Sequence, residues 1–179
     1  MIGSNSEIQS EVWLRPHLFH ITGPDTFYVP PTCNSALARS EDFMKLRLAV
    51  ADDNADVLSE LISVLETEFD VVVTATDGKS ALESIRSCSP DVVVLDLEMS
   101  GLNGIEVTRE LSKHAPRPAV VICTVECDPE IIEAAREAGA LGYVFKPRIR
   151  KDLVAAVKSV VRGQSFVSPA LHSLPTPRL

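Results

Sequence analysis

Hydrophobic residues change their spacing repeatedly between residues 46 and 163 of the chain. Short runs of aliphatic and β-branched residues, such as Asp91-Val-Val-Val-Leu-Asp96, alternate with segments whose apolar residues recur every three or four positions. The short runs predict strands that are buried on both faces, and the second spacing predicts amphipathic helices. Because strand and helix alternate five times, we expect a five-stranded parallel sheet with helices on both faces.

The expected strands cover residues 46–50, 71–75, 91–96, 119–123 and 141–145, and the last helix runs from about residue 150 to residue 162. Chemical signals mark three helix boundaries. Asn54 can accept hydrogen bonds from free backbone N–H groups at a helix start, Pro129 suits a first helical turn, and Gly139 suits a helix end.

The two ends of the chain differ from this regular part. Residues 1–43 contain four prolines and no sustained period, so we expect an irregular N-terminal extension there. Met44 is followed directly by a predicted strand, and we hypothesise that residues 1–43 lie upstream of the true start codon. Residues 44–168 then form the domain, and residues 169–179, with three prolines, form a short disordered tail.

Composition limits the classes of function. The net charge of -8 argues against non-specific nucleic-acid binding, which needs clustered Lys and Arg, and it is compatible with carboxylates gathered around a divalent cation. The four cysteines show no zinc-type pairing, and we expect free thiols in a reducing compartment. We find neither a signal-peptide pattern nor an apolar run that could cross a bilayer, so we expect a cytoplasmic protein with no membrane association.

Polar residues follow the predicted strands at their carboxyl ends. Asp52 and Asp53 follow the first strand, Asp96 ends the third, Thr124 follows the fourth, and Lys146 follows the fifth. Parallel strands bring these positions to one edge, where open α/β sheets bind ligands. Three carboxylates placed together repel one another, and a hard divalent cation such as Mg²⁺ relieves that repulsion. Lys146 and Thr124 could stabilise a transferred phosphoryl group, and one carboxylate could attack phosphorus to form an acyl phosphate.

Each of these residues alone has a simpler interpretation. A single Asp after a strand is usually a helix cap, a Lys-Pro pair is usually a surface turn, and a Thr usually makes a local hydrogen bond. Their combined placement at the ends of the appropriate strands favours the phosphoryl-transfer site.

From about Lys45 to Ser168 the chain resembles a receiver domain of a bacterial two-component response regulator, and most closely the receiver half of NarL/FixJ-type (LuxR-type) regulators. The resemblance rests on the charged positions together with the motifs Asp96-Leu-Glu-Met-Ser-Gly-Leu-Asn-Gly104, Ala138-Gly-Ala-Leu-Gly-Tyr-Val-Phe-Lys146 and Gly163-Gln-Ser-Phe-Val-Ser-Pro169. It implies a flavodoxin-like (βα)5 fold with strand order 2-1-3-4-5. Only ten residues follow Pro169, so we expect no helix-turn-helix and no direct nucleic-acid binding.

The resemblance also implies roles for single residues. Asp96 would accept the phosphoryl group from a histidine kinase. Mg²⁺ would be held by the side chains of Asp53 and Asp96 and by the backbone carbonyl of Glu98, with Asp52 acting largely through water. Lys146 would contact the phosphoryl group.

The same resemblance implies a conformational switch. The peptide bond before Pro147 would often be cis. Thr124 would move toward the phosphoryl group and Tyr143 would swing inward. These shifts would repack the face formed by the fourth helix, the fifth strand and the fifth helix, which would then bind an output protein or a second copy of the chain.

Several positions depart from the family pattern or are expected to tune the phosphoryl lifetime. Ser100 stands where proline is common. Glu98 and Glu126 stand two residues after the phosphoacceptor and the Thr, respectively. Val125 replaces a smaller residue, and we expect it to restrict water and slow dephosphorylation.

Two other readings are open. A haloacid-dehalogenase-type hydrolase would need its nucleophile first in the chain and a second Asp two residues later, where this chain has Glu98. A receiver-like interaction module that works without phosphorylation would not need the complete set of Asp, Thr and Lys. We therefore expect a signalling receiver that catalyses only its own phosphorylation and dephosphorylation.

Overall fold

A computed structural model of the chain describes residues 45–169, so the expectations for residues 1–43 and for the tail beyond Pro169 lie outside the described residues. Strands and helices alternate as the hydrophobic pattern predicts. In chain order the elements are β1 Arg47–Ala51, α1 Ala55–Leu65, β2 Asp70–Ala75, α2 Gly78–Cys88, β3 Val92–Asp96, α3 Gly104–Ser112, β4 Ala119–Thr124, α4 Pro129–Ala138, β5 Gly142–Phe145, the 3-10 turn η1 Lys146–Arg148, α5 Ile149–Val161 and β6 Phe166–Val167.

The strands form one parallel sheet in the order β2-β1-β3-β4-β5-β6. Strand β3 lies inside the sheet, and all five of its residues are buried. Its register sets Asp96 beside Cys123 of β4, so the carboxyl ends of these two strands are level. The sheet therefore brings the polar residues that follow β1, β3, β4 and β5 to a common edge.

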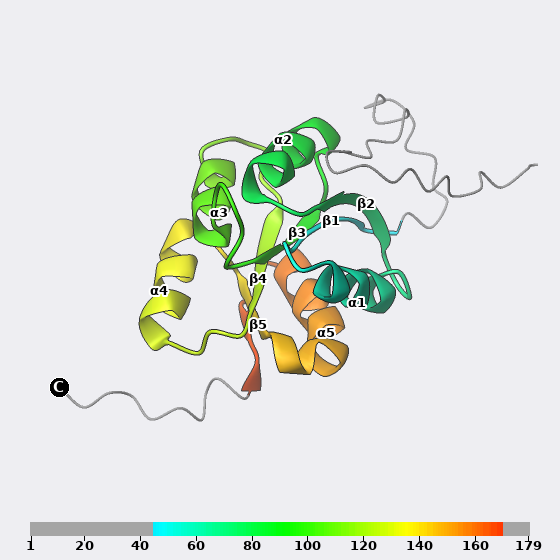
Figure 1. Cartoon of the computed structure of the whole chain (residues 1–179), viewed down its shortest axis with the longest axis vertical. Helices are drawn as coiled ribbons and strands as arrows, with labels where there is room; N and C mark the ends of the chain where they lie inside the picture. The colour runs from blue at the N-terminus through cyan, green and yellow to red at the C-terminus, as the bar shows by residue number, and fades with distance from the viewer. Residues whose placement is uncertain (1–44, 170–179) are drawn as a thin grey trace, which may run out of the picture.

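Helices cover both faces of the sheet. Helices α2, α3 and α4 lie on one face, and α1 and α5 lie on the other (Figure 1). Each layer has its own apolar core, because alternate residues of a strand point to opposite faces. Val93 and Leu95 of β3 belong to the core under α2 and α3, whereas Val92 and Val94 belong to the core under α1 and α5.

The helix boundaries follow the predicted signals. The side chain of Asn54 accepts hydrogen bonds from the backbone N–H groups of Asp56 and Val57. Pro129 is the first residue of α4, and Gly139 ends that helix with φ of 111°, a conformation that favours glycine.

The sheet has six strands rather than the five that we expected. Strand β6 pairs with the outer edge of β5, where Phe166 lies opposite Gly142 and Val167 opposite Tyr143. A strand of two residues has no hydrophobic period of its own, so the pattern could not reveal it. Its position depends on contacts with residues that lie far away in the chain.

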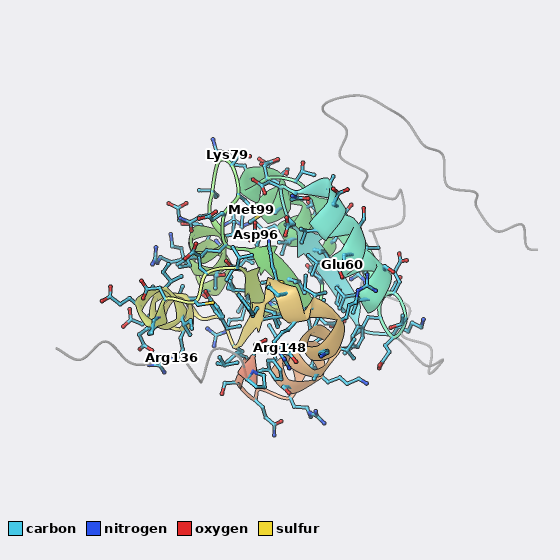
Figure 2. All side chains as sticks on the ribbon, turned by 60° about the horizontal axis from the view of Figure 1, so that its bottom comes forward. Glu60, Lys79, Asp96, Met99, Arg136 and Arg148 are labelled. Carbon is cyan, nitrogen blue, oxygen red and sulfur yellow. The ribbon has the colours of Figure 1, made fainter. Side chains whose placement is uncertain are left out.

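Ser168 makes the contacts that hold β6 in place. Its hydroxyl donates to Asp152 Oδ2 at 2.8 Å and accepts from the backbone N–H of Phe145 at 3.1 Å. Its own N–H donates to the carbonyl of Tyr143 at 2.9 Å. Asp152 in turn accepts two hydrogen bonds from the guanidinium of Arg148, whose place beside α5 can be followed in Figure 2. These hydrogen bonds hold the pKa of the Asp152 carboxyl below its ordinary value, with Arg148 as the main cause.

Two further observations concern the described residues. Cys88, Cys123 and Cys127 form no disulfide bond, and Cys33 lies outside the described part. Between residues 45 and 169, no helix is both long and apolar enough to span a bilayer.

Replacing Ser168 with alanine is expected to lower the free energy of unfolding by about 1–3 kcal/mol, because a buried carboxylate and a backbone N–H each lose a hydrogen-bonding partner. Urea unfolding with an unchanged m-value would measure this loss. The matched control is Ser165→Ala, since Ser165 is exposed on the same segment; a loss of equal size in both variants would contradict the role of Ser168.

The contribution of Asp152 to the free energy of unfolding should decrease at low pH. Because its pKa is lowered on folding, its contribution is complete above the unfolded pKa of about 3.9 and disappears as the pH falls through the folded value. The difference in the free energy of unfolding between wild type and Asp152→Asn should therefore stay constant between about pH 7 and pH 5 and shrink below about pH 4.

Candidate functional site

The polar residues predicted for the sheet edge come together there. Asp52, Asp53 and Asp96 each direct a carboxylate oxygen into one group, and these oxygens all lie within 4.8 Å of one another. Asp52 is fully buried and Asp96 is 4% exposed, whereas Asp53 is exposed. Figure 2 shows Asp96 at the end of the central strands. The site therefore has two buried carboxylates at its base and one at its mouth.

Lys146 bridges the two buried carboxylates. Its ammonium nitrogen lies 2.8 Å from Asp52 Oδ2 and 3.0 Å from Asp96 Oδ1. Burial lowers the pKa of Lys146, but its close ion pairs with the two carboxylates outweigh this effect, so its pKa is raised overall. Lys146 is therefore a fixed positive charge at the base of the site.

Asp96 is under opposing influences. Burial raises the pKa of its carboxyl group, Lys146 lowers it, and the charge of Asp52 raises it again, so that the pKa lies above its ordinary value. The neighbouring Cys123 is fully buried, and burial raises the pKa of its thiol well above the ordinary range. Cys123 is thus a neutral, unreactive neighbour of Asp96.

The donor set fits a divalent cation. Among the described residues, Asp52 Oδ2 is the buried side-chain oxygen that accepts no hydrogen bond of ordinary geometry, although the Lys146 ammonium lies 2.8 Å from it. Three carboxylates with one ammonium leave an excess of negative charge, and hard cations such as Mg²⁺ take oxygen ligands. Asp53 and Asp96 offer side-chain oxygens for this purpose, and the role of the Glu98 backbone carbonyl as a further ligand stays a prediction.

The loop of residues 97–103, here called the β3–α3 loop, follows Asp96 directly. Leu97 and Met99 are buried in the core, and Glu98 between them is exposed. At the base of the loop, the N–H of Gly104 donates to the carbonyl of Leu97 at 2.9 Å. At its tip, the N–H of Gly78 donates to the carbonyl of Ser100 at 3.1 Å. The loop is therefore held at both ends.

Sequence reasoning did not single out Gly78 or Gly104. A Cβ atom at Gly104 would come within 2.2 Å of the carbonyl oxygen of Asp96, so only glycine fits there. The signals were present as the glycine that ends the Asp96–Gly104 motif and as the Asp77-Gly78 turn, but a turn glycine does not reveal which distant backbone it touches.

Thr124, Glu126 and Tyr143 form a connected group beside the site. The hydroxyl of Thr124 accepts from the backbone N–H of Glu126 at 3.1 Å, and the hydroxyl of Tyr143 donates to the Glu126 carbonyl at 3.3 Å. Tyr143 is 3% exposed, and burial raises the pKa of its hydroxyl far above the ordinary value. Tyr143 thus already lies inward in the unmodified chain, and its coupled movement with Thr124 stays a prediction.

The expectation of a cis peptide bond before Pro147 is wrong for this structure. Within residues 45–169 the cis bond is Ala115–Pro116, and the Lys146–Pro147 bond is trans. Pro147 lies in the turn η1, which leads directly into α5 and provides the backbone conformation that proline prefers.

Val125 is an exposed apolar residue next to Thr124 in the chain. It follows the last residue of β4, and its side chain is 58% exposed, the largest value among the exposed large apolar residues of the described part. Glu126 is half-buried. An exposed apolar side chain therefore stands directly after Thr124, and its control of water access to the carboxylates stays a prediction.

Comparisons with known proteins agree with one another. Residues 48–158 match the model of the response regulator receiver domain family. The chain is similar to the transcriptional regulatory protein YvfU of Bacillus subtilis, with 37% identity over 128 residues that cover 70% of this chain and 64% of YvfU. It is also similar to the DNA-binding response regulator MtrA of Mycobacterium tuberculosis, with 39% identity over 122 residues that cover 68% of this chain and 53% of MtrA.

Among solved structures, a two-component response regulator of the LuxR family from Aurantimonas sp. SI85-9A1 is similar, with a TM-score of 0.68 and 31% identity, covering 72% of this chain and 93% of that one. The chain spans between half and two thirds of the length of the curated relatives that it matches.

Replacing Lys146 with methionine should make Asp96 titrate at higher pH. The substitution removes the ammonium that lowers the pKa of Asp96, while burial and the charge of Asp52 continue to raise it. The carbon-13 shift of the Asp96 carboxyl group, followed against pH in metal-free buffer, measures the change. Lys79→Met removes an exposed lysine instead and should leave the titration of Asp96 as in wild type; an unaltered titration in Lys146→Met would contradict the assignment.

Proposed function

Because this chain belongs to the response regulator receiver family of two-component systems, we propose that it accepts a phosphoryl group on Asp96 from a histidine kinase, with Mg²⁺ as cofactor. The observation that carries this proposal is the Lys146 ammonium bridging Asp52 and Asp96 within a group of three carboxylates. An ammonium and a divalent cation are the charges that phosphoryl transfer requires.

The proposed step is a displacement at phosphorus. A carboxylate oxygen of Asp96 attacks the phosphorus of a phosphohistidine, the P–O bond forms, and the P–N bond to the imidazole breaks. The leaving imidazole takes up a proton, and Asp96 becomes an acyl phosphate. Mg²⁺ would neutralise charge on the phosphoryl oxygens when bound. Lys146 supports the phosphoryl group from the base of the site, and Thr124 supplies a hydroxyl near it.

The output of the receiver is the second part of the proposal. Thr124 and Tyr143 both form hydrogen bonds with the backbone of Glu126, so a movement of Thr124 would shift Glu126 and change the hydrogen bond of Tyr143 on β5. We expect the face formed by α4, β5 and α5 to change its packing and to bind an output protein or a second copy of the chain. Strand β6 covers the edge of β5 and therefore belongs to this face. We propose that this occurs in the cytoplasm.

One observation favours a second function. Tyr143 is already buried in the unmodified chain, which is the position that phosphorylation is expected to stabilise. A chain that holds this conformation without phosphorylation could act as a receiver-like interaction module. Uptake of a phosphoryl group on Asp96 distinguishes the two functions.

Incubation with acetyl phosphate and Mg²⁺ should add one phosphoryl group to the wild type and none to Asp96→Ala, because Asp96 is the proposed nucleophile. Intact-mass spectrometry measures this directly. Chelation of Mg²⁺ should abolish the addition. A folded wild-type protein that gains no mass would reject phosphorylation in favour of the interaction module.

Val125→Ala should shorten the lifetime of the phosphoryl group several-fold, because a smaller side chain admits water to the acyl phosphate. The decay of the phosphorylated mass with time gives the lifetime. Val161→Ala is the control, since Val161 is also exposed, at 41%, but lies at the end of α5. Equal lifetimes in wild type and Val125→Ala would show that Val125 does not control water.

A further inference from the structure

Gly78 has no room for a side chain because the β3–α3 loop lies against it. A Cβ atom at Gly78 would be 1.9 Å from the carbonyl oxygen of Leu102 and 2.7 Å from its carbonyl carbon. These are backbone atoms, so no side-chain rotation can relieve the overlap. The N–H of Gly78 donates to the carbonyl of Ser100 at 3.1 Å. Gly78 therefore holds the loop by a hydrogen bond, and its lack of a side chain leaves space for the loop backbone.

The backbone conformation does not explain this glycine. In the described part of the chain, the glycines with positive φ are Gly101, Gly139 and Gly163, so Gly78 has a conformation that alanine could adopt. The loop contact is therefore the reason why position 78 needs glycine.

Gly78 cannot easily move away from the loop, since it is the first residue of α2 and the helix start is fixed. The preceding residue, Asp77, caps the helix by accepting hydrogen bonds from the N–H groups of Lys79 and Ser80, each at 3.0 Å. The hydroxyl of Ser80 also donates to the Asp77 carboxylate. A side chain at position 78 would therefore displace the loop rather than the helix.

The loop has little freedom to absorb such a displacement. It begins at Asp96 and closes at Gly104, where a Cβ atom would lie 2.2 Å from the Asp96 carbonyl oxygen. Figure 2 shows Lys79, Met99 and Asp96 following one another from the rim toward the middle of the molecule. The stem of Lys79 also lies beside Gly101, because a Cβ atom there would be 3.3 Å from Lys79 Cγ. Glu98 lies between Asp96 and Ser100 in the chain, so a shift of the tip can reach Asp96 through the backbone of Glu98.

We propose that Gly78 is a positioning residue for the acidic site: by fixing the tip of the β3–α3 loop, it sets the place of the Glu98 carbonyl beside Asp53 and Asp96. This inference rests on the proposed function, because Glu98 matters in this way only if the site holds a divalent cation. Gly78 lies on α2, outside the carboxylate cluster, and acts through the loop.

The test compares Mg²⁺ binding by the unphosphorylated full chain and its Gly78→Ala variant, using titration calorimetry. Residues that orient metal ligands typically change metal affinity by about 10–100-fold when replaced, and we expect a loss of about tenfold here. Phosphorylation by acetyl phosphate should slow at limiting Mg²⁺ and recover when the Mg²⁺ concentration is raised. Wild-type affinity in a folded Gly78→Ala protein would overturn the proposal.

Gly142→Ala is the matched control for the steric overlap that an added Cβ atom causes. A Cβ atom there would come within 2.8 Å of a Val121 methyl group, in the core at the start of β5 and away from the loop. It should lower the thermal midpoint while Mg²⁺ affinity stays at the wild-type value. An equal loss of Mg²⁺ affinity in Gly142→Ala would assign the effect to general destabilisation and overturn the proposal.

Leu102→Gly tests the same contact by changing the loop instead of α2. This variant replaces Gly78→Ala in the experiment if Gly78→Ala does not fold. It removes a side chain that packs against the core and loosens the loop tip without any overlap. The proposal requires weaker Mg²⁺ binding in this variant, and unchanged binding would overturn it. A wild-type protein that binds no Mg²⁺ and gains no phosphoryl group would instead reject the proposed function on which the inference depends.

Discussion

The burial of two carboxylates at the end of a parallel sheet is the constraint on which the site depends. Moving a charged carboxylate out of water is costly unless an opposite charge and hydrogen bonds replace the lost hydration. Lys146 provides that charge to Asp52 and Asp96 together, and Asp52 also accepts a hydrogen bond from the N–H of Asn54 at 3.0 Å. Because the three charged residues follow β1, β3 and β5, the ion pairs form only if these strands keep their register.

One ammonium cannot balance three carboxylates. Burial is the main reason why the pKa of Asp96 is raised, and the negative charge of Asp52 adds to this effect. The site is thus electrostatically incomplete by itself, and a cation would improve the local balance of charge. The same imbalance lowers the cost of placing a cation near an oxygen nucleophile, so metal binding and reactivity have a common physical origin.

Much of the fold and the site could be predicted because the signals were local. The aliphatic run of β3, the cap at Asn54, and Pro129 and Gly139 at the ends of α4 depend on residues close together in the sequence. The topology of a parallel sheet then brought the polar residues together without further information.

The features that escaped prediction depend on distant contacts. Strand β6 exists because Ser168 reaches Asp152 and Phe145, and a two-residue segment carries no sign of this. The peptide bond before Pro147 is trans, as suits the turn η1 that leads into α5, and not cis as the family resemblance implied. Gly78 looks like an ordinary turn glycine until the backbone of Leu102 is seen beside it.

Strand β6 affects the tendency of the protein to aggregate through the edge of its sheet. An open sheet edge can recruit the edge of another molecule, and a long, flat, apolar edge is a nucleus for aggregation. Here β5, which is largely buried and apolar, is covered by a strand of only two residues, and the exposed Pro169 follows shortly after it. Since proline lacks the N–H that continued pairing would need, the described edge offers too short a template for intermolecular strand pairing. Loss of the Ser168 contacts would expose the edge of β5 and make it available for strand pairing with another molecule.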